Sequence, residues 1–581
     1  MGDGEKCGVR SPDLPITPSP NRLTQRAARW HAAFLVLLLL LALHALPTMG
    51  VFVVSDDLAW VQRAATDAHK PWNAFVQPLF GDYYRPIPEL VWTLNYRLWG
   101  FDFEGHQLMF ILMWLGGVCT VYAVGCRLGG RIAGFAAATL IGLNDVYLAI
   151  SSWKSWYTTV TEYVSVLACV WATLKWLEER RAGYAIAAAA LAVIAVLSRE
   201  LAPLVLSAVA FFTLVLPGFK TPGPGRRRAA GWLIVWAVVT GAVLLALPSY
   251  RSSLSKWLKS EPALASTAAS AQTSRAAYVW TRFVGHARSI FGVSSRDHRF
   301  GWGVSCCLVW FATALAALRA RRERPALSGR YRRVLIGAFL LGTVLLATPW
   351  AIGAIGGESL PGSHRQPAFS LQVQAYCVEY LEPAAAALLI LLFCAAAFSG
   401  DRLDRMLGAW FVVSFTPVLF LEHASNAYHL LALTALALFV ARALSGFAHD
   451  ELLPAVARLR RKTPADGDDD ARYVLVAIFA VLVFIQAMKL GTNVRLADSE
   501  IRNRVAYGRA MKARVGRAIQ NVLESAGPSR RVWVAPQPYA ELAGLILHEK
   551  YGFELERPNQ PGAVAPKFSD PLVPIQADAS R

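Results

Sequence analysis

Two adjacent carboxylates directly follow the first long apolar segment of the chain. Asp56 and Asp57 come after the apolar residues 31–53, a stretch long enough to cross the about 30 Å of hydrocarbon in a bilayer. Ionised groups at a membrane edge are costly unless they are solvated, paired or functional. A carboxylate there can accept the proton of an attacking hydroxyl as general base, or hold a divalent cation beside a phosphate leaving group. The alternative is that the pair forms a solvated helix end.

The composition sets the class of protein. Of 581 residues, 55% are hydrophobic and 17% are charged, and the mean hydropathy is +0.38. So much apolar surface cannot be hidden in one soluble core, which predicts an all-α polytopic membrane protein. The net charge of +19 comes largely from short basic segments between apolar spans. The positive-inside rule accounts for most of it, and no nucleic-acid partner is expected.

The apolar segments predict a bundle of about 13 transmembrane helices. Arg22, Arg26 and Arg29 precede the first span without a nearby acid, which places the N-terminus in the cytoplasm and the Asp pair outside. A cleaved signal peptide is the competing interpretation, but the polar stretch before the apolar core is long for a leader. The predicted spans are 31–53, 106–126, 132–150, 157–176, 184–198, 201–217, 230–248, 302–319, 334–352, 380–398, 406–421, 430–445 and 473–491.

This topology divides the chain into three parts. Residues 1–29 are expected to be a disordered cytoplasmic N-terminus, residues 30–492 the transmembrane domain, and residues 493–581 a small extracytoplasmic α/β tail. The sequence pattern of the tail predicts a polar helix at 497–526, a strand at 531–535 and a helix at 539–551, followed by a Pro-rich end without periodicity.

Two outer loops are large, at residues 55–105 and 249–301. The first contains four tryptophans and, from Pro88 to Trp99, apolar residues at roughly helical spacing. This pattern predicts interfacial helices that lie on the membrane surface. The second loop is strongly basic, which predicts contact with anionic lipid headgroups or with the phosphate of a lipid carrier.

The motifs of the first outer loop resemble those of C-type fold (GT-C) membrane glycosyltransferases. The chain is similar to bacterial relatives of the protein O-mannosyltransferases and of the lipid A aminoarabinose transferases. The resemblance covers about residues 30 to 220, and it departs from the family in having Arg199 where a lysine before the glutamate is usual. The matching elements are Asp56-Asp57, Tyr84-Arg85-Pro86, Leu98-Trp99-Gly100 with His106, and Ser198-Arg199-Glu200 with Pro203.

The resemblance implies a transferase that takes a hexose or pentose from a polyprenyl-phosphate carrier outside the plasma (inner) membrane. The acceptor would be a lipid, a glycan or a protein of the cell envelope. In such enzymes a carboxylate of the first outer loop acts at the reaction centre, so Asp56 or Asp57 is the expected base. The other would orient the acceptor or hold a divalent cation, which is the one cofactor that the pattern allows.

A departing lipid phosphate needs positive charge, and a guanidinium can grip two of its oxygens at once. Arg85 and Arg199 are the leading candidates. Arg199 and Glu200 could equally form an ion pair that ends a helical hairpin, and Glu89 has the same ambiguity. His423 and Tyr428 lie in a late outer turn whose position is similar to a substrate-contacting loop of these transferases.

Two other functions remain open. A lipid-linked sugar transporter or flippase would place ionisable residues near the centres of spans and would show repeated halves, whereas the charges here gather at outer helix ends. A noncatalytic protein of envelope assembly would not need the acidic pair. Neither a phosphate-binding nor a dinucleotide-binding glycine motif is present, which favours a lipid-linked donor over a nucleotide sugar.

Overall fold

A computed structural model of the chain describes most of its N-terminal third and several later segments. Three predicted spans (230–248, 302–319 and 334–352) and the outer loop 249–301, apart from Phe283, lie outside the described residues. The described residues are 20–51, 57–77, 84–199, 202–210, 283, 382–416, 429–448, 467–525, 531–534, 538–556 and 573–575.

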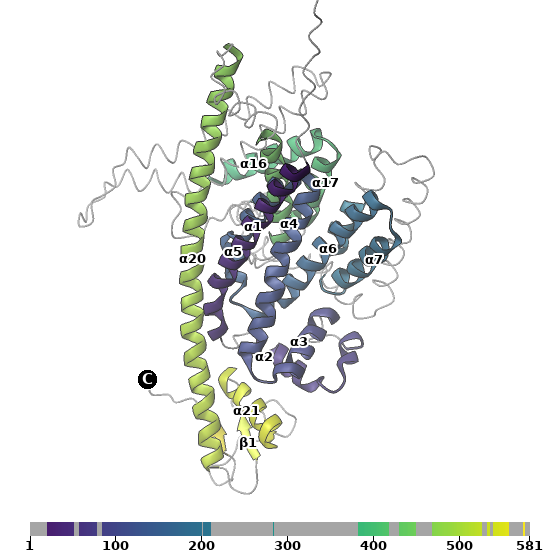
Figure 1. The fold of residues 1–581 in the computed structure, drawn as a ribbon. Coiled ribbons are helices and arrows are strands. Elements are labelled where there is room, and N and C mark those ends of the chain that lie inside the picture. The colour runs from purple at the N-terminus through teal and green to yellow at the C-terminus, as the bar shows by residue number, and fades with distance from the viewer. Residues whose placement is uncertain are drawn as a thin grey trace, which may run out of the picture.

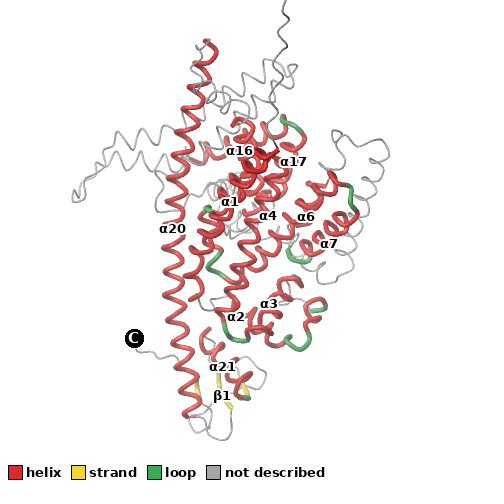
Figure 2. Tube along the Cα trace, in the orientation of Figure 1, coloured by secondary structure: helices red, strands yellow, loops and turns green. Residues whose placement is uncertain are grey.

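The described chain is mostly helical (Figures 1 and 2). The longer helices are α1 (Pro20–Ala45), α4 (Phe103–Gly142), α6 (Tyr157–Glu179), α7 (Ala182–Val196), α16 (Glu382–Ser399), α17 (Arg402–Phe415), α18 (Leu430–Phe447) and α20 (Gly467–Ser525). The shorter ones are η1 (Leu46–Gly50), α2 (Asp57–Thr66), η2 (Pro71–Phe75), α3 (Pro86–Trp99), α5 (Asp145–Ile150), η3 (Lys154–Trp156), α8 (Ala202–Ala210) and α21 (Pro538–Tyr551).

Within the described residues, four helical segments are long and apolar enough to cross a membrane. They are Ala28–Gly50, Phe103–Gly142, Lys154–Glu179 and Leu430–Phe447, and two shorter apolar helices are Ala182–Val196 and Ala387–Phe398. The count of about 13 spans stays a prediction. The helix predicted from Pro88 to Trp99 is confirmed as α3.

Helix α4 is a hairpin that turns back at two glycines. Gly129 and Gly130 have non-helical backbone angles, and Gly130 has a φ of 81°, a conformation that favours glycine. A Cβ added at Gly125 would lie 2.8 Å from the Cα of Gly134, whereas nine residues of straight helix span about 13.5 Å. The two arms match the predicted spans 106–126 and 132–150, and α5 completes the second.

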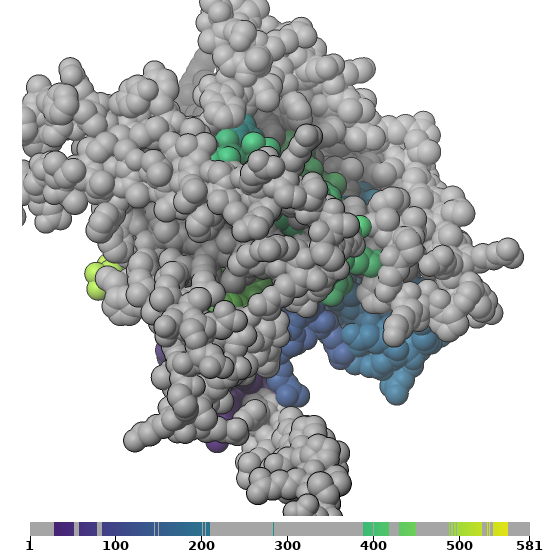
Figure 3. All heavy atoms as spheres, turned by 90° about the horizontal axis from the view of Figure 1, so that it is seen from above, coloured from purple at the N-terminus to yellow at the C-terminus, as the bar shows by residue number. Residues whose placement is uncertain are grey.

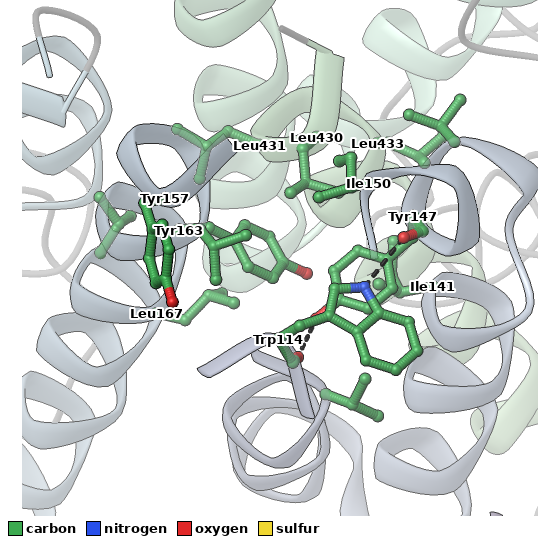
Figure 4. Close-up of a cluster of buried hydrophobic side chains, with 14 of the residues drawn as sticks. Trp114, Ile141, Tyr147, Ile150, Tyr157, Tyr163, Leu167, Leu430, Leu431 and Leu433 are labelled. Atoms are coloured by element: carbon green, nitrogen blue, oxygen red, sulfur yellow. Dashed lines mark hydrogen bonds between the residues drawn. The ribbon is translucent and has the colours of Figure 1, made fainter. Parts of the chain in front are cut away.

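An aromatic cluster fixes the α4 hairpin against α6 and α18 (Figure 4). The indole Nε1 of Trp114 donates to the carbonyl of Tyr147 at 2.9 Å, and the Tyr147 hydroxyl donates to the carbonyl of Trp114. The Tyr163 hydroxyl lies 3.0 Å from Thr434 Oγ1 and so joins α6 to α18. These rings are fully buried with their polar atoms paired, so the bundle offers a rigid base for the loops at its ends.

One end of the bundle gathers residues that the sequence assigns to the cytoplasmic side. Arg442 of α18 forms ion pairs with Asp401 and Asp404 beside α17, and its Nε donates to the carbonyl of Leu128 at 3.0 Å. Figure 3 views the molecule from the end where α16 and α17 lie and shows described residues of α16 to α18 in teal and green. The helices α2 and α3 lie at the other end (Figure 1).

Helix α20 runs along the bundle without a break. Its 59 residues correspond to about 88 Å. The sequence predicts a span at 473–491 and a separate polar helix at 497–526, and this separation is wrong. Gly491 does not end the helix, since one glycine costs only about 1 kcal/mol in a helix interior. Beyond Gly491 the helix continues with a stripe of buried residues on one side, and these are Ala497, Ile501, Val505, Met511 and Val515.

A small sheet lies beside α21 near the C-terminal end of α20 (Figure 2). Its three strands are parallel in the order β2-β1-β3, with Val532 opposite both Leu555 and Val573. The strands are β1 (Arg531–Val534), β2 (Glu554–Glu556) and β3 (Val573–Ile575). The sequence predicts β1 and α21 but no strand in the Pro-rich end, because three-residue strands are too short to show alternation. Pro574 is tolerated in β3, which is an edge strand.

Candidate active site

Asp57 is the first residue of α2 and is fully buried, with 0% of its surface exposed. A helix N-terminus favours a carboxylate because the backbone N–H groups there point toward it. The interpretation of this residue as part of a solvated helix end is therefore wrong. Asp56 lies outside the described residues.

Lys154 is a buried cation beside Asp57. It belongs to η3, its exposure is 0%, and its Nζ donates to the carbonyl of Val51 at 2.5 Å. The ammonium group interacts electrostatically with the Asp57 carboxylate, and α2 packs against η3. A buried carboxylate is tolerated when such a partner compensates its lost hydration. Sequence reasoning missed Lys154, although a cation on the predicted outer side departs from the positive-inside rule.

A hydrogen-bonded network joins the first outer loop to α4 and α6. The Tyr157 hydroxyl donates to the carbonyl of His106 at 2.6 Å and accepts from Asn95 Nδ2 at 2.9 Å. The His106 ring lies 2.9 Å, through Nε2, from the carbonyl of Gly100. Asp57 also acts electrostatically on Tyr157. The start of α6 therefore holds the surroundings of Asp57 in place.

Arg199 contacts the first turns of α6. Its Nη1 donates to Thr159 Oγ1 at 2.6 Å and lies 3.8 Å from Glu162 Oε2. Both charged side chains are buried, with 4% and 2% of their surface exposed. The partner Glu162, which sequence reasoning missed, lies inside a predicted span and comes from a different helix than the expected Glu200. Glu200 lies outside the described residues.

A backbone contact brings the other candidate arginine toward Arg199. The N–H of Ile87 donates to the carbonyl of Leu197 at 3.4 Å. Arg85, which directly precedes α3, is two residues before Ile87. Arg199 is two residues after Leu197. Arg199 therefore lies at the first turns of α6, and the start of α3, which follows Arg85, lies next to the segment that leads to Arg199.

Glu89 forms a buried ion cluster within the first outer loop. The Nε of Arg63 lies 2.6 Å from Glu89 Oε1 and 2.6 Å from Asp67 Oδ2, and both carboxylates have 2% of their side-chain surface exposed. Burial raises the pKa of Glu89 above its ordinary value, the neighbouring Asp67 adds to this rise, and Arg63 opposes it. The cluster ties α2 to α3. A substrate role of Glu89 stays a prediction.

The remaining predicted contacts, His423 and Tyr428, lie outside the described residues. His429, the next described residue along the chain, is buried and its ring centroid lies 5.9 Å from that of Phe415. The residue that ends the late outer turn, His429, therefore lies next to the end of α17, and the contacts of His423 and Tyr428 with substrate stay predictions.

Among the described residues, the cation that acts on Asp57 is the ammonium group of Lys154. In the described part of the chain, no group of three or more His, Cys, Asp or Glu side chains is arranged to hold a metal. The positive charge of Lys154 would also repel a cation bound to Asp57. The predicted divalent cation at Asp56 and Asp57 stays untested, and no step proposed below depends on it.

No family model matches this chain, and no protein of curated function matches it. Among solved structures, the chain is similar to ArnT from Cupriavidus metallidurans in the apo state, with 13% identity and a TM-score of 0.41 over 92% of this chain and 86% of that one. The same protein bound to undecaprenyl phosphate gives 13% identity and a TM-score of 0.34, over 91% and 86%.

A second similar structure is the Archaeoglobus fulgidus oligosaccharyltransferase tethered to an acceptor peptide. It has 13% identity and a TM-score of 0.40, over 90% of this chain and 63% of that longer one. The lipid A aminoarabinose transferases named from the sequence are thus among the solved structures that this chain resembles. These likenesses are too distant to place a residue or a substrate, so the proposals below rest on the chain's own residues.

Proposed function

We propose that this protein is an integral membrane glycosyltransferase. It moves a hexose or pentose from a polyprenyl-phosphate carrier to a lipid, glycan or protein acceptor on the outer face of the plasma membrane. Its N-terminus is cytoplasmic, and its active site and C-terminal tail are extracytoplasmic.

One observation carries this proposal: a fully buried carboxylate, Asp57, lies beside the buried cation Lys154 at the membrane-edge end of the helical bundle. Burying both charges costs free energy that a purely structural contact between apolar residues would not. Such an arrangement is typical of a site where a charge is needed for chemistry.

Each residue has a distinct task in the reaction. Asp57 accepts the proton of the acceptor hydroxyl, whose oxygen forms a bond to the anomeric carbon of the sugar. The bond from that carbon to the carrier phosphate breaks, and the electron pair leaves with the polyprenyl phosphate. Arg85 and Arg199 stabilise the charge that develops on the phosphate. A single displacement of this kind inverts the anomeric centre.

Lys154 has a positioning role in this scheme. Its ammonium is anchored to the carbonyl of Val51, so a positive charge stays in a fixed position from which it acts on the Asp57 carboxylate. The hydrogen bonds of Tyr157 hold a second neighbour of Asp57 in place. A base that is already oriented needs no rearrangement when the acceptor arrives.

The proposal is tested with purified protein in lipid vesicles that contain radiolabelled polyprenyl-phosphate sugars on their outer leaflet, together with envelope extract. The expected result is label that becomes covalently attached to material in the extract. Label that crosses the bilayer while still attached to its carrier would instead identify a transporter. No movement of label from any of the common sugar carriers would contradict the proposal.

A further inference from the structure

A basic patch lies on the outer half of α20. It consists of Arg509, Lys512, Arg514 and Arg517, all of them exposed. No acidic residue occurs between Glu500 and Glu524. The four cations fall within nine residues of one helix, a length of about 12 Å.

Internal ion pairs do not account for the patch. Lys512 lies 3.5 Å from Glu104 of α4, but both side chains are well exposed, at 67% and 59%. Within the part of the chain that the structure describes, Arg509, Arg514 and Arg517 have no ion pair. The buried stripe of α20 includes Met511 and Val515. At about 100° per residue, Arg509 and Arg517 lie on the opposite, exposed side of the helix, while Arg514 and Lys512 lie on its two flanks.

The bilayer surface is not the best partner for Arg514 and Arg517, the two cations of the patch that lie farthest along α20. The apolar segment Ala28–Gly50 ends where Gly50 meets α20, since a Cβ there would lie 3.4 Å from Val505 Cγ1. Arg514 and Arg517 follow Val505 by nine and twelve residues, or about 13 and 18 Å along a continuous helix. These two distances exceed the about 8 Å over which charges act in physiological salt, whereas Arg509, four residues after Val505, lies within that range at about 6 Å.

The surface around the patch fits an extended anionic sugar chain. Tyr507, with 49% of its surface exposed, lies one helical heptad before Arg514 and therefore on nearly the same face. An aromatic ring can pack against the apolar face of a sugar ring, while the cations meet its acidic groups. A folded protein partner would need a larger complementary surface with an apolar centre.

We propose that the basic patch binds an anionic glycan, with carboxylate or phosphate groups on its sugars, and guides it to the active site as the acceptor. The ion pair of Lys512 with Glu104 places the patch next to the start of α4, two residues before the active-site His106. The acceptor role rests on the proposed function, whereas the binding of the glycan does not.

The test measures binding of fluorescein-labelled oligogalacturonate to the protein in nanodiscs of neutral lipid. We expect Arg514→Gln/Arg517→Gln to weaken binding about threefold to tenfold and to flatten its salt dependence. The control, Arg495→Gln/Arg502→Gln, removes two exposed arginines of α20 that precede Val505, one of them ion-paired with Asp498, and should change affinity less than twofold. Equal weakening by both pairs, or no binding by the parent protein, would overturn the proposal.

Two further measurements separate the parts of the inference. Tyr507→Ser should weaken oligogalacturonate binding without changing its salt dependence, and unchanged affinity would contradict a glycan as the ligand. Asp57→Asn should leave binding intact. If the parent binds the glycan but transfers no sugar, only the proposed function fails. If transfer occurs but the patch variant binds normally, only this inference fails.

Discussion

At the residue scale, the central feature is a buried carboxylate that interacts electrostatically with a buried cation. Asp57 has no exposed surface, and the ammonium group that acts on it, that of Lys154, donates to the carbonyl of Val51. Removing one member of a buried ion pair leaves the other uncompensated, which typically costs about 3–5 kcal/mol. The two residues should therefore behave as a unit in stability as well as in catalysis.

This coupling predicts the effect of Lys154→Met. The variant should lower the amount of folded protein in the membrane because the Asp57 carboxylate loses its partner. Adding Asp57→Asn removes the uncompensated charge and should restore most of that amount. The measurement is the yield of monodisperse protein after detergent extraction, and a double variant as poor as Lys154→Met would show that the two residues are not coupled.

The pair Glu89 and Arg63 gives a pH-dependent prediction. Because the pKa of Glu89 is raised in the folded state, folding disfavours its ionised form. This destabilising contribution is present above the folded pKa and disappears below the ordinary value of 4.5. Glu89→Gln, whose amide oxygen can still accept from Arg63, should therefore unfold at a higher temperature than the parent at pH 7.

The difference between Glu89→Gln and the parent should shrink as the pH falls through this range, because Glu89 then becomes neutral as well. The measurement is the thermal unfolding midpoint in detergent at several pH values. A lower midpoint for the variant at pH 7 would mean that the attraction of Arg63 outweighs the cost of burial.

At the scale of the elements, the α4 hairpin depends on glycines where two backbones meet. Gly125→Ala should destabilise the protein by about 1–3 kcal/mol, because its Cβ would lie 2.8 Å from the Cα of Gly134. Gly116→Ala is the matched control in the same arm. It has open space and should be neutral or stabilise by up to about 1 kcal/mol. Unfolding midpoints of the two variants test the hairpin, and equal effects would argue against it.

The elements also show what could be predicted from the sequence. Long apolar runs and an amphipathic pattern predict α1, α4, α6, α18 and α3 well, because hydrophobic periodicity is a local property. Continuity through Gly491 in α20 could not be predicted, since it depends on packing along the bundle. The interactions of Asp57 with Lys154 and of Arg199 with Glu162 join residues far apart in the chain. Neither the composition nor a local sequence pattern predicts such interactions.

The resemblance to known transferases pointed to Asp56 or Asp57 as the base and to Arg85 and Arg199 as phosphate-binding candidates. The structure adds that Arg199 contacts Thr159 and Glu162 in the first turns of α6. Asp57 acts electrostatically on Tyr157 in the same turns, and no motif had singled out these residues of α6. Glu162 was overlooked because it lies in an apolar span, although an acid inside a span is itself a signal of function. Lys154 was overlooked because its neighbours are aromatic and resemble an interfacial anchor.

At the scale of the whole molecule, the structure separates two ends. The tail contacts the end that carries the candidate site: Lys550 lies 5.9 Å from the Phe101 ring centroid, and Arg504 lies 4.8 Å from the Trp153 ring centroid. Arg127 and Glu178 form an ion pair at the other end of α6. If the site faces outward, the tail shares its compartment, and the loop between α6 and α7 does not.

Cysteine labelling tests this orientation. A Cβ added at Gly516 in α20 or at Gly183 in α7 would meet open space, so cysteine should be tolerated at each position. A membrane-impermeant maleimide added to intact spheroplasts should label Gly516→Cys but label Gly183→Cys only after permeabilisation, with the parent protein as the background. The reverse pattern would place the candidate site in the cytoplasm.

The central claim is that Asp57 performs chemistry, and the most direct measurement compares sugar transfer by Asp57→Asn and Asp102→Asn. Asp102 caps α4 through the backbone N–H of Glu104 at 3.1 Å, and asparagine caps a helix equally well. At equal abundance, Asp57→Asn should lose about 100-fold to 10,000-fold in rate, while Asp102→Asn should transfer sugar like the parent. Normal transfer by Asp57→Asn would contradict the assignment of Asp57 as the base.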